Sequence, residues 1–438
     1  MSKNKEKNLN EKRSTKMGRF LRILGPGLIT GAADDDPSGI ATYSQTGAQF
    51  GFGQLWASLY QLPLLIAIQE TCARIGAVTG KGLAGVVKEN FSKKVLSAVV
   101  FLVVIANTIN IGADIGAMAS AAELVWNLPF AFYAIIFSVL IVWLEVFVSY
   151  KKYVKFLKWL AMILVAYIFT ALIIEHSWSE IWVATFVPNI QFNFDYLFII
   201  TGVFGTTITP YMFFWQASEE VEEEIEHHNL PQKGGKPHGL KKFLRNMRVD
   251  TAVGMLWSQI GQWFIVITAA SVFFKNGITD INSAADAARA LEPLVQSFPN
   301  SGQIAKDIFA VGIIGLGLLG IPVLAGSAAY ALAEAMGWKE GLYRRFSQAK
   351  GFYAVIVAST FIGLLINFIG INPFKALVFT AVFNGVAAVP LLFVVAKING
   401  SKKILGNYSG NFLSRFLVWL TFIFMTAAVV GLFYTLFN

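Results

Sequence analysis

The sequence is dominated by apolar segments long enough to cross a lipid bilayer. A helix needs roughly 20 apolar residues to span the hydrocarbon core. Because the bilayer core offers no water to backbone polar groups, such segments fold as helices. We expect eleven membrane helices, at 21–50, 54–76, 95–125, 130–150, 153–176, 196–220, 249–274, 303–336, 351–370, 373–397 and 411–437. The chain is therefore predicted to be an all-α polytopic membrane protein.

Composition supports this class and disfavours others. Hydrophobic residues make up 55% of the chain and charged residues 14%, with a mean hydropathy of +0.59. Soluble domains carry about a quarter charged residues. Cys72 is the only cysteine, so no intramolecular disulfide can form. The sequence contains no Gly-rich nucleotide-binding loop with its lysine. We expect no cofactor, no enzymatic activity and no nucleic-acid partner.

The loops differ in charge from one side of the membrane to the other. Loops after even-numbered segments are rich in Lys and Arg, as in WKEGLYRRFSQAKG, whereas WNLPF and EHSWSEIWVATFVPNIQFNFDYL contain neither. Lys-rich and Arg-rich loops stay in the cytosol. We expect a bacterial inner (plasma) membrane location with the N-terminus cytosolic and the C-terminus external. A basic arm at 1–20 and a loop at 221–248 would be cytosolic, and the acidic run EEVEEEIEHH would be a solvated helix end.

The first and sixth segments each contain a central proline. They read ILGPGLITGAADDDPSGIATYSQTGAQFGF and FIITGVFGTTITPYMFFWQA. Proline lacks an N–H and clashes with the preceding turn, so Pro37 and Pro210 are each expected to break a helix. Backbone groups freed within a membrane must line a polar cavity. Two kinked structural helices are the alternative, but the buried carboxylate at the first break favours a substrate site.

The two broken segments lie five spans apart, so the second enters the membrane from the opposite side. Matched breaks in two halves indicate a transporter built from inverted repeats. We expect the first repeat at 21–176 (spans 1–5), the second at 196–397 (spans 6–10) and an additional helix at 411–437. Such a bundle suits alternating access better than a channel.

Four stretches resemble the Nramp (natural resistance-associated macrophage protein) family of divalent-metal transporters. They are GPGLITGAADDDPSGIATYSQTGAQFG, ARIGAVTGKGLAGVV, NTINIGADIGAMASA and GTTITPYMFFWQAS. The first is similar to the family's Asp-Pro-Gly-Asn motif and the last to its Met-Pro-His-Asn motif. The resemblance implies a LeuT-type fold, with two inverted five-helix repeats, an eleventh helix, and broken spans 1 and 6.

The sequence departs from the family at the metal ligands. Asp36 keeps the family's aspartate, whereas Ser38 replaces a glycine, Gly39 an asparagine and Thr209 the methionine. Selection of Mn²⁺ or Fe²⁺ over Mg²⁺ or Ca²⁺ relies on a soft sulfur or nitrogen ligand. Thr209 supplies neither, so the departures disfavour transition-metal transport.

The proton-relay positions also differ. Tyr211 and Gln216 stand where the family has two histidines. Asp114 matches a family carboxylate used in proton movement, but Ala117 replaces the neighbouring glutamate. We assign the coupling-ion or proton pathway to Asp36, Asp114 and Gln216, with Na⁺ or H⁺ as the coupling ion.

Two substrates remain. Mg²⁺ keeps much of its water and takes one or two carboxylates, which Asp36 could supply together with hydroxyls and backbone carbonyls. A small oxyanion would instead use the N–H groups that Gly39 leaves uncovered at a helix start. Neutral donors are available from the hydroxyls of Ser38, Thr42, Thr209 and Tyr211. Asp36 would then hold the coupling cation. The resemblance is compatible with both, since the wider family includes magnesium transporters and bicarbonate carriers. Bicarbonate is our first hypothesis and Mg²⁺ the alternative.

Three further readings concern buried charge. Glu70 and Arg74, four residues apart on one helix, are expected to form an ion pair at the inner gate. Asp34 and Asp35 are placed at the cytosolic vestibule, either solvated or in direct contact with the ion. An intramembrane aspartyl protease would also need two buried carboxylates, which Asp36 and Asp114 could supply, but it would leave the break in the sixth span unexplained.

Overall fold

The structure, a computed structural model, describes residues 25–148, 164–226 and 240–437. None of these residues lies in a strand. Eight helices within them are long and apolar enough to cross a membrane. Their elements are α5 (Trp56–Thr79), α7 (Lys93–Val125), α8 (Phe130–Phe147), α12 with α13 (Phe194–Thr207, Pro210–Glu226), α14 (Leu240–Val272), α17 (Ser301–Met336), α19 (Pro373–Gly400) and α21 (Phe412–Phe437).

The remaining three predicted spans correspond to shorter helices. The first is divided into α3 (Pro26–Asp34) and α4 (Pro37–Phe50), the fifth contains α10 (Leu164–Ile173) and the ninth is α18 (Lys350–Ile366). The predicted arm at 1–20 and the start of the fifth span lie outside the described residues. Helix occupies both ends of the predicted loop 221–248, because α13 continues to residue 226 and α14 begins at residue 240.

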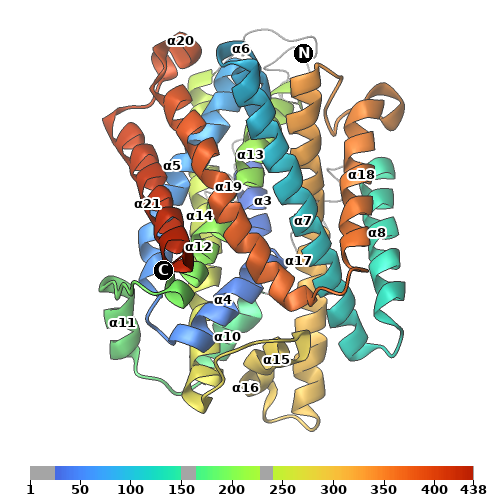
Figure 1. The fold of residues 1–438 in the computed structure, drawn as a ribbon, viewed down its shortest axis with the longest axis vertical. Coiled ribbons are helices and arrows are strands. Elements are labelled where there is room, and N and C mark those ends of the chain that lie inside the picture. The colour runs from blue at the N-terminus through green and yellow to red at the C-terminus, as the bar shows by residue number, and fades with distance from the viewer. Residues whose placement is uncertain (1–24, 149–163, 227–239, 438) are drawn as a thin grey trace, which may run out of the picture.

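Short helices mark the two ends of the bundle (Figure 1). At the end predicted to be cytosolic are α6 (Leu83–Asn90) and α20 (Lys402–Leu405), followed by the 3₁₀ turn η5 (Gly406–Tyr408). At the opposite end are α11 (Trp178–Phe186), α15 (Ala284–Ala288) and α16 (Glu292–Val295). The turns η2 (Phe274–Asn276), η3 (Arg289–Leu291) and η4 (Phe346–Gln348) complete the described elements.

The two broken spans pack in a mirrored way. The halves of the first span, α3 and α4, lie against α14, the seventh span, while α13 of the sixth lies against α5, the second span. The third and eighth spans, α7 and α17, pack against each other. This reciprocal arrangement is the one that an inverted repeat produces.

Small residues bring α3 against the backbone of α14. A Cβ atom on Gly27 would lie 2.5 Å from the backbone nitrogen of Thr251, and one on Gly254 would strike the Gly27 carbonyl. Membrane helices use small residues in this way because lipid provides no hydrophobic driving force between helices. The contact holds α3 directly against the backbone of α14.

Asp250 of α14 caps the start of α3. Its carboxylate accepts hydrogen bonds from the N–H groups of Gly25 (2.8 Å), Gly27 (2.7 Å) and Leu28 (3.1 Å). The first N–H groups of a helix have no partner within it, and negative charge is stabilising there. The buried Asp250 thus holds α3 at its first residues, the end of this half-helix that is farthest from the break.

Candidate functional site

Both predicted breaks lie at their prolines. Helix α3 ends at Asp34 and α4 begins at Pro37, while α12 ends at Thr207 and α13 begins at Pro210. Each proline occupies the first position of the second half-helix, where its missing N–H and fixed φ are well tolerated. The two gaps face the interior of the bundle, since the residues flanking them are buried.

Asp36 is the N-cap of α4. Its Oδ1 accepts from the Gly39 N–H at 2.9 Å and from the Ser38 hydroxyl at 2.6 Å. Its Oδ2 accepts from Nδ2 of Asn110 on α7 at 3.0 Å. The side chain is buried, at 1% exposure. Three donors therefore orient one carboxylate at the centre of the membrane bundle.

Asn110 connects Asp36 to a second carboxylate. Its Nδ2 also lies 3.5 Å from Oδ2 of Asp114, one turn along α7. Gly320 of α17 faces the same place, because a Cβ there would lie 3.0 Å from the Asp36 Cβ and 4.0 Å from the Asp114 Oδ2. Oδ1 of Asp114 and Oδ1 of Asn110 are buried without a hydrogen-bond partner. Because buried polar atoms are nearly always satisfied, these oxygens fit a cation or water as partner.

Except for Thr209, the groups predicted to bind an oxyanion are engaged with the protein. The Ser38 hydroxyl donates to Asp36, and the Thr42 hydroxyl donates to the Ser38 carbonyl at 2.7 Å. The Gly39 N–H, expected to be open to an anion, is the donor that Asp36 caps. The start of α4 is thus already occupied by a negative charge of the protein itself.

Two tyrosines tie the breaks to each other reciprocally. The Tyr211 hydroxyl on α13 donates to the Ala33 carbonyl on α3 at 3.0 Å. The Tyr43 hydroxyl on α4 lies 2.9 Å from Oγ1 of Thr207 on α12. Each second half-helix therefore reaches the first half-helix of the other broken span. Thr209, within the second break, is fully buried and its hydroxyl has no hydrogen-bond partner among the described residues.

The expectation that Asp34 and Asp35 could be solvated is wrong. Both are completely buried, because α14 covers them. Asp34 accepts a hydrogen bond from the Ser258 hydroxyl on α14. A Cβ on Gly261 would lie 3.0 Å from Oδ2 of Asp35. The three consecutive acids thus divide, with the first two facing α14 and Asp36 facing α7.

Asp36, Asn110 and Asp114 form one group, here called the Asp36 cluster. Gln216 is not hydrogen-bonded to it. Its amide donates to Oε1 of Glu220, one turn further along α13, at 2.8 Å. Its part in a coupling pathway stays a prediction.

The prediction of a solvated acidic helix end is wrong for Glu219, Glu220 and Glu224, which are buried, whereas Glu226 is exposed and the two histidines that end the run lie outside the described residues. Helix α13 packs against α5 and α17.

Glu70 and Arg74 form the expected ion pair, at 2.9 Å. Arg248 of α14 pairs with the same carboxylate at 2.9 Å. Arg74 is itself buried and also donates to the Tyr408 carbonyl at 2.7 Å and to Asn399 at 3.0 Å. The pair therefore joins α5 to α14, α19 and η5, while its action as a gate stays a prediction.

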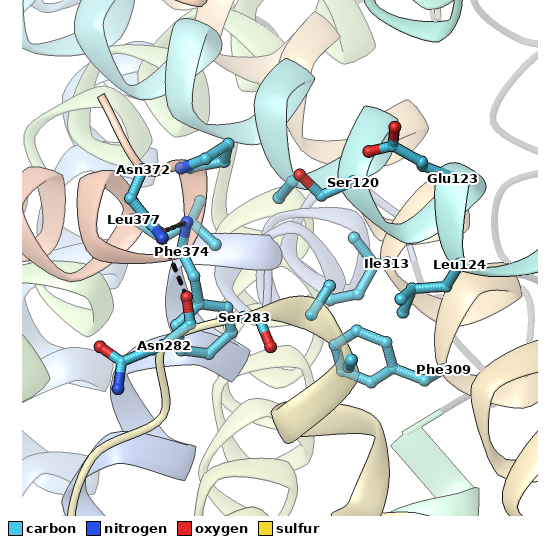
Figure 2. Close-up of a pocket in the computed structure, with 14 residues that line it drawn as sticks. Ser120, Glu123, Leu124, Asn282, Ser283, Phe309, Ile313, Asn372, Phe374 and Leu377 are labelled. Carbon is cyan, nitrogen blue, oxygen red and sulfur yellow. Dashed lines mark hydrogen bonds between the residues drawn. The ribbon is translucent and has the colours of Figure 1, made fainter. Parts of the chain in front are cut away.

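A cavity of about 210 Å³ lies between α7, α15, α17 and α19, towards the end predicted to be external. Its polar lining includes Ser120 and Glu123 of α7, Ser283 and Asn372 (Figure 2). Ala117 also lines the cavity, and it lies one helical turn from Asp114. The cavity thus approaches the Asp36 cluster along one face of α7.

The donor set bears on which ion fits. Among the described residues, no three His, Cys, Asp or Glu side chains gather closely enough to hold a metal ion. A cation beside Asp36 would therefore rest on one or two carboxylates, completed by amide, hydroxyl and backbone oxygens and by water. Such a set of oxygen ligands suits hard divalent cations, Mg²⁺, Ca²⁺ and Mn²⁺ among them.

Sequence reasoning missed several residues that position the site. Ser258, Asp250 and Gly320 lie in unbroken spans and belong to no motif noted above. Asn110 lies within the stretch NTINIGADIGAMASA, and an amide in an apolar helix either faces a pathway or bonds to a neighbouring helix. In the structure Asn110 bonds between helices, because its partner is Asp36 at the start of α4.

Comparison with known proteins agrees with this architecture. The family model for natural resistance-associated macrophage protein-like (Nramp) proteins matches residues 27–435. A divalent metal cation transporter MntH of Caldanaerobacter subterraneus is 25% identical over 407 residues, covering 91% of this chain and 89% of that protein. A Staphylococcus aureus MntH is 26% identical over 321 residues, covering 70% and 67%.

Solved structures share the fold. A manganese transporter of Eremococcus coleocola superposes with a TM-score of 0.71 at 16% identity, covering 96% of this chain and 88% of that one. Mhp1, a nucleobase-cation-symport-1 family transporter, gives a TM-score of 0.55 at 12% identity, covering 94% and 93%. The LeuT-type fold that the family resemblance implied is confirmed. Since the family model spans almost the whole sequence, this chain belongs to the Nramp family of membrane transporters.

Proposed function

We propose that this transporter carries a divalent metal cation, bound at the break of the first span beside Asp36. One observation carries the proposal: a buried carboxylate with unpartnered oxygens of Asp114 and Asn110 next to it. Cations are stabilised by such oxygen groups, and a negative charge buried in a membrane bundle marks an ion pathway. The names of the MntH relatives support a divalent metal ion.

The helix ends around the site also favour a cation. The C-termini of α3 and α12 point partial negative charge towards the breaks. The opposing N-termini offer little to an anion, because Asp36 caps α4 and α13 begins with Pro210, which has no N–H. Bicarbonate would have to displace or adjoin a carboxylate of the protein. The arrangement therefore supports the cation over the oxyanion.

The ligands favour a hard cation. Oxygen groups suit Mg²⁺ and Mn²⁺ alike, whereas a thioether discriminates in favour of softer ions. Thr209 supplies a hydroxyl at the second break and no sulfur. We therefore propose Mg²⁺ as the substrate that the site serves best. The protease alternative is dropped, because membership in a transporter family accounts for both breaks.

Transport would follow alternating access. The ion would enter through the cavity at Ala117, pass Asp114 and bind beside Asp36. Spans 1, 2, 6 and 7 would then move against spans 3, 4, 8 and 9. Within the second group, span 3 (α7) packs against span 8 (α17) in this structure. Na⁺ or H⁺ coupling through Asp114 is part of this proposal.

Uptake into proteoliposomes of the purified protein tests the substrate. Internal dyes would report Mg²⁺, Mn²⁺ and pH after external addition of each cation or of bicarbonate, with and without a Na⁺ gradient. We expect saturable Mg²⁺ uptake that exceeds Mn²⁺ uptake, with no alkalinisation by bicarbonate. Alkalinisation without any metal signal would overturn the proposal and restore bicarbonate as the substrate. Stronger uptake of Mn²⁺ than of Mg²⁺ would refute the selectivity while keeping the cation.

A further inference from the structure

A second cavity lies far from the breaks, at the end predicted to be cytosolic. Its volume is about 570 Å³, and it opens between α5 and α21, which lie side by side in Figure 1. The turn η5 and the first part of α14 close its polar end, where Arg248, Asn407 and Asn411 line it. Pro63, Ile66 and Leu417 line the rest. The cavity is therefore polar at one end and apolar along the membrane helices.

Within the described part of the chain, the polar end carries one more positive charge than negative charge. Glu70 is the only acid among the described residues that line the cavity, and both Arg74 and Arg248 bond to it. Arg74 is buried and uses Nε, Nη1 and Nη2 for bonds within the protein. Arg248 has a side chain that is 58% exposed and donates to Glu70 only through Nε. Since no other described residue is hydrogen-bonded to its two terminal nitrogens, they form an open fork for a phosphate or carboxylate.

The side of the cavity formed by α21 faces lipid. Leu413 lines it and is 60% exposed, and on the same helix Phe412 and Phe416 are 86% and 53% exposed. Large apolar side chains exposed along a membrane helix mark the surface in contact with acyl chains. A molecule in this cavity would therefore meet the bilayer sideways, with its charged part at the level of the cytosolic headgroups.

We propose that this groove binds one anionic phospholipid, with its phosphate on the free fork of Arg248 and an acyl chain between α5 and α21. Basic pockets between membrane helices on the cytosolic side bind anionic headgroups, and that leaflet is rich in them. The lipid would touch α5, α14 and α21 together, next to the Glu70–Arg74 pair. Its binding does not depend on which ion the transporter carries.

Native mass spectrometry of the delipidated full-length protein tests the proposal, with phosphatidylglycerol and phosphatidylcholine titrated separately. Arg248→Gln removes the fork. Asn411→Asp adds a negative charge at the headgroup end while keeping the N-cap of α21, where Asn411 accepts from the Ser414 N–H at 2.8 Å. Arg245→Gln is the matched control, since Arg245 is exposed on the same stretch of α14 and does not line the cavity.

We expect the wild-type protein to retain one phosphatidylglycerol in preference to phosphatidylcholine. Arg248→Gln and Asn411→Asp should each weaken that binding about fivefold, the effect of one charge near a headgroup, and Arg245→Gln should not. Equal binding by wild-type and Arg248→Gln protein would overturn the proposal, as would an equal loss in Arg245→Gln. Displacement of the lipid by millimolar glycerol phosphate would indicate a site for free phosphate instead. If Arg248→Gln protein does not fold, Asn411→Asp decides alone.

Discussion

The two broken spans share a backbone plan and differ in chemistry. In each, a proline begins the second half-helix, and a tyrosine of that half-helix bonds to the first half of the other span. The first break contains Asp35 and Asp36, whereas the second contains Ile208 and Thr209. Each inverted repeat thus supplies one broken helix, while the acidic residues at the breaks come from the first repeat only.

This difference shows how a symmetric fold makes an asymmetric site. A half-helix pair in each repeat positions polar backbone ends at mid-membrane. Side chains then decide the ion, because one carboxylate balances part of a cation's charge and a hydroxyl balances none. The comparison predicts unequal effects of equivalent substitutions at the two breaks.

Asp36→Asn is expected to have the largest effect. Asparagine keeps the size and N-cap function of Asp36 but removes the charge, so folding is retained and cation binding is lost. Uptake of Mg²⁺ should fall by more than about tenfold, a loss typical even of residues outside the ligand shell. Proteoliposome uptake at equal protein density measures it.

Thr209→Ala is the matched change at the second break. Its hydroxyl is neutral and unpartnered, so Mg²⁺ uptake should fall less than about fivefold, in keeping with about 1 kcal/mol for one neutral polar group. If Thr209→Ala abolished uptake while Asp36→Asn retained it, the charge asymmetry between the breaks would have no functional meaning.

Thr209→Met sharpens the comparison by giving the second break a soft ligand. A thioether favours Mn²⁺ over Mg²⁺, so the ratio of Mn²⁺ to Mg²⁺ uptake should rise several-fold. Thr209→Leu, of similar bulk and without sulfur, is the control for overpacking in this buried position. An equal rise in the leucine variant would attribute the change to size and not to sulfur.

The smallest expected effects concern the two tyrosines. Tyr211→Phe and Tyr43→Phe should each destabilise the protein by about 1 kcal/mol, the usual contribution of a buried hydrogen bond. Tyr43→Phe should cost less, because its partner Thr207 keeps a hydrogen bond to the Val203 carbonyl at 2.8 Å. Thermal unfolding in detergent gives the order, and a lower midpoint for Tyr43→Phe than for Tyr211→Phe would contradict it.

Much of the fold follows from patterns that are local in sequence. Apolar length located the spans, with the predicted 373–397 and 411–437 lying within three residues of the observed α19 and α21 at each end. Pro37 and Pro210 located the breaks, because the missing N–H of a proline removes a helical hydrogen bond regardless of the surrounding helices. The i,i+4 spacing of Glu70 and Arg74 likewise fixed their contact without reference to any other helix.

The rest depends on how helices are rotated about their axes, which local pattern does not fix. Asp34 and Asp36 are two residues apart, yet one meets Ser258 of α14 and the other Asn110 of α7. The sequence shows that Ser38 and Thr42 carry hydroxyl groups. Only the structure shows that both hydroxyls donate to other groups of the protein. For this reason the sequence alone left the oxyanion and the cation nearly balanced.

The most direct test is to locate the bound ion. Crystals grown with Mn²⁺ as a probe for divalent cations would give an anomalous signal at its position. The account predicts one peak between α3 and α4, within about 2.2 Å of a carboxylate oxygen of Asp36, ligated by oxygen atoms only. A protein that takes up divalent cations but shows no peak at Asp36, or shows it elsewhere in the bundle, would contradict the central claim.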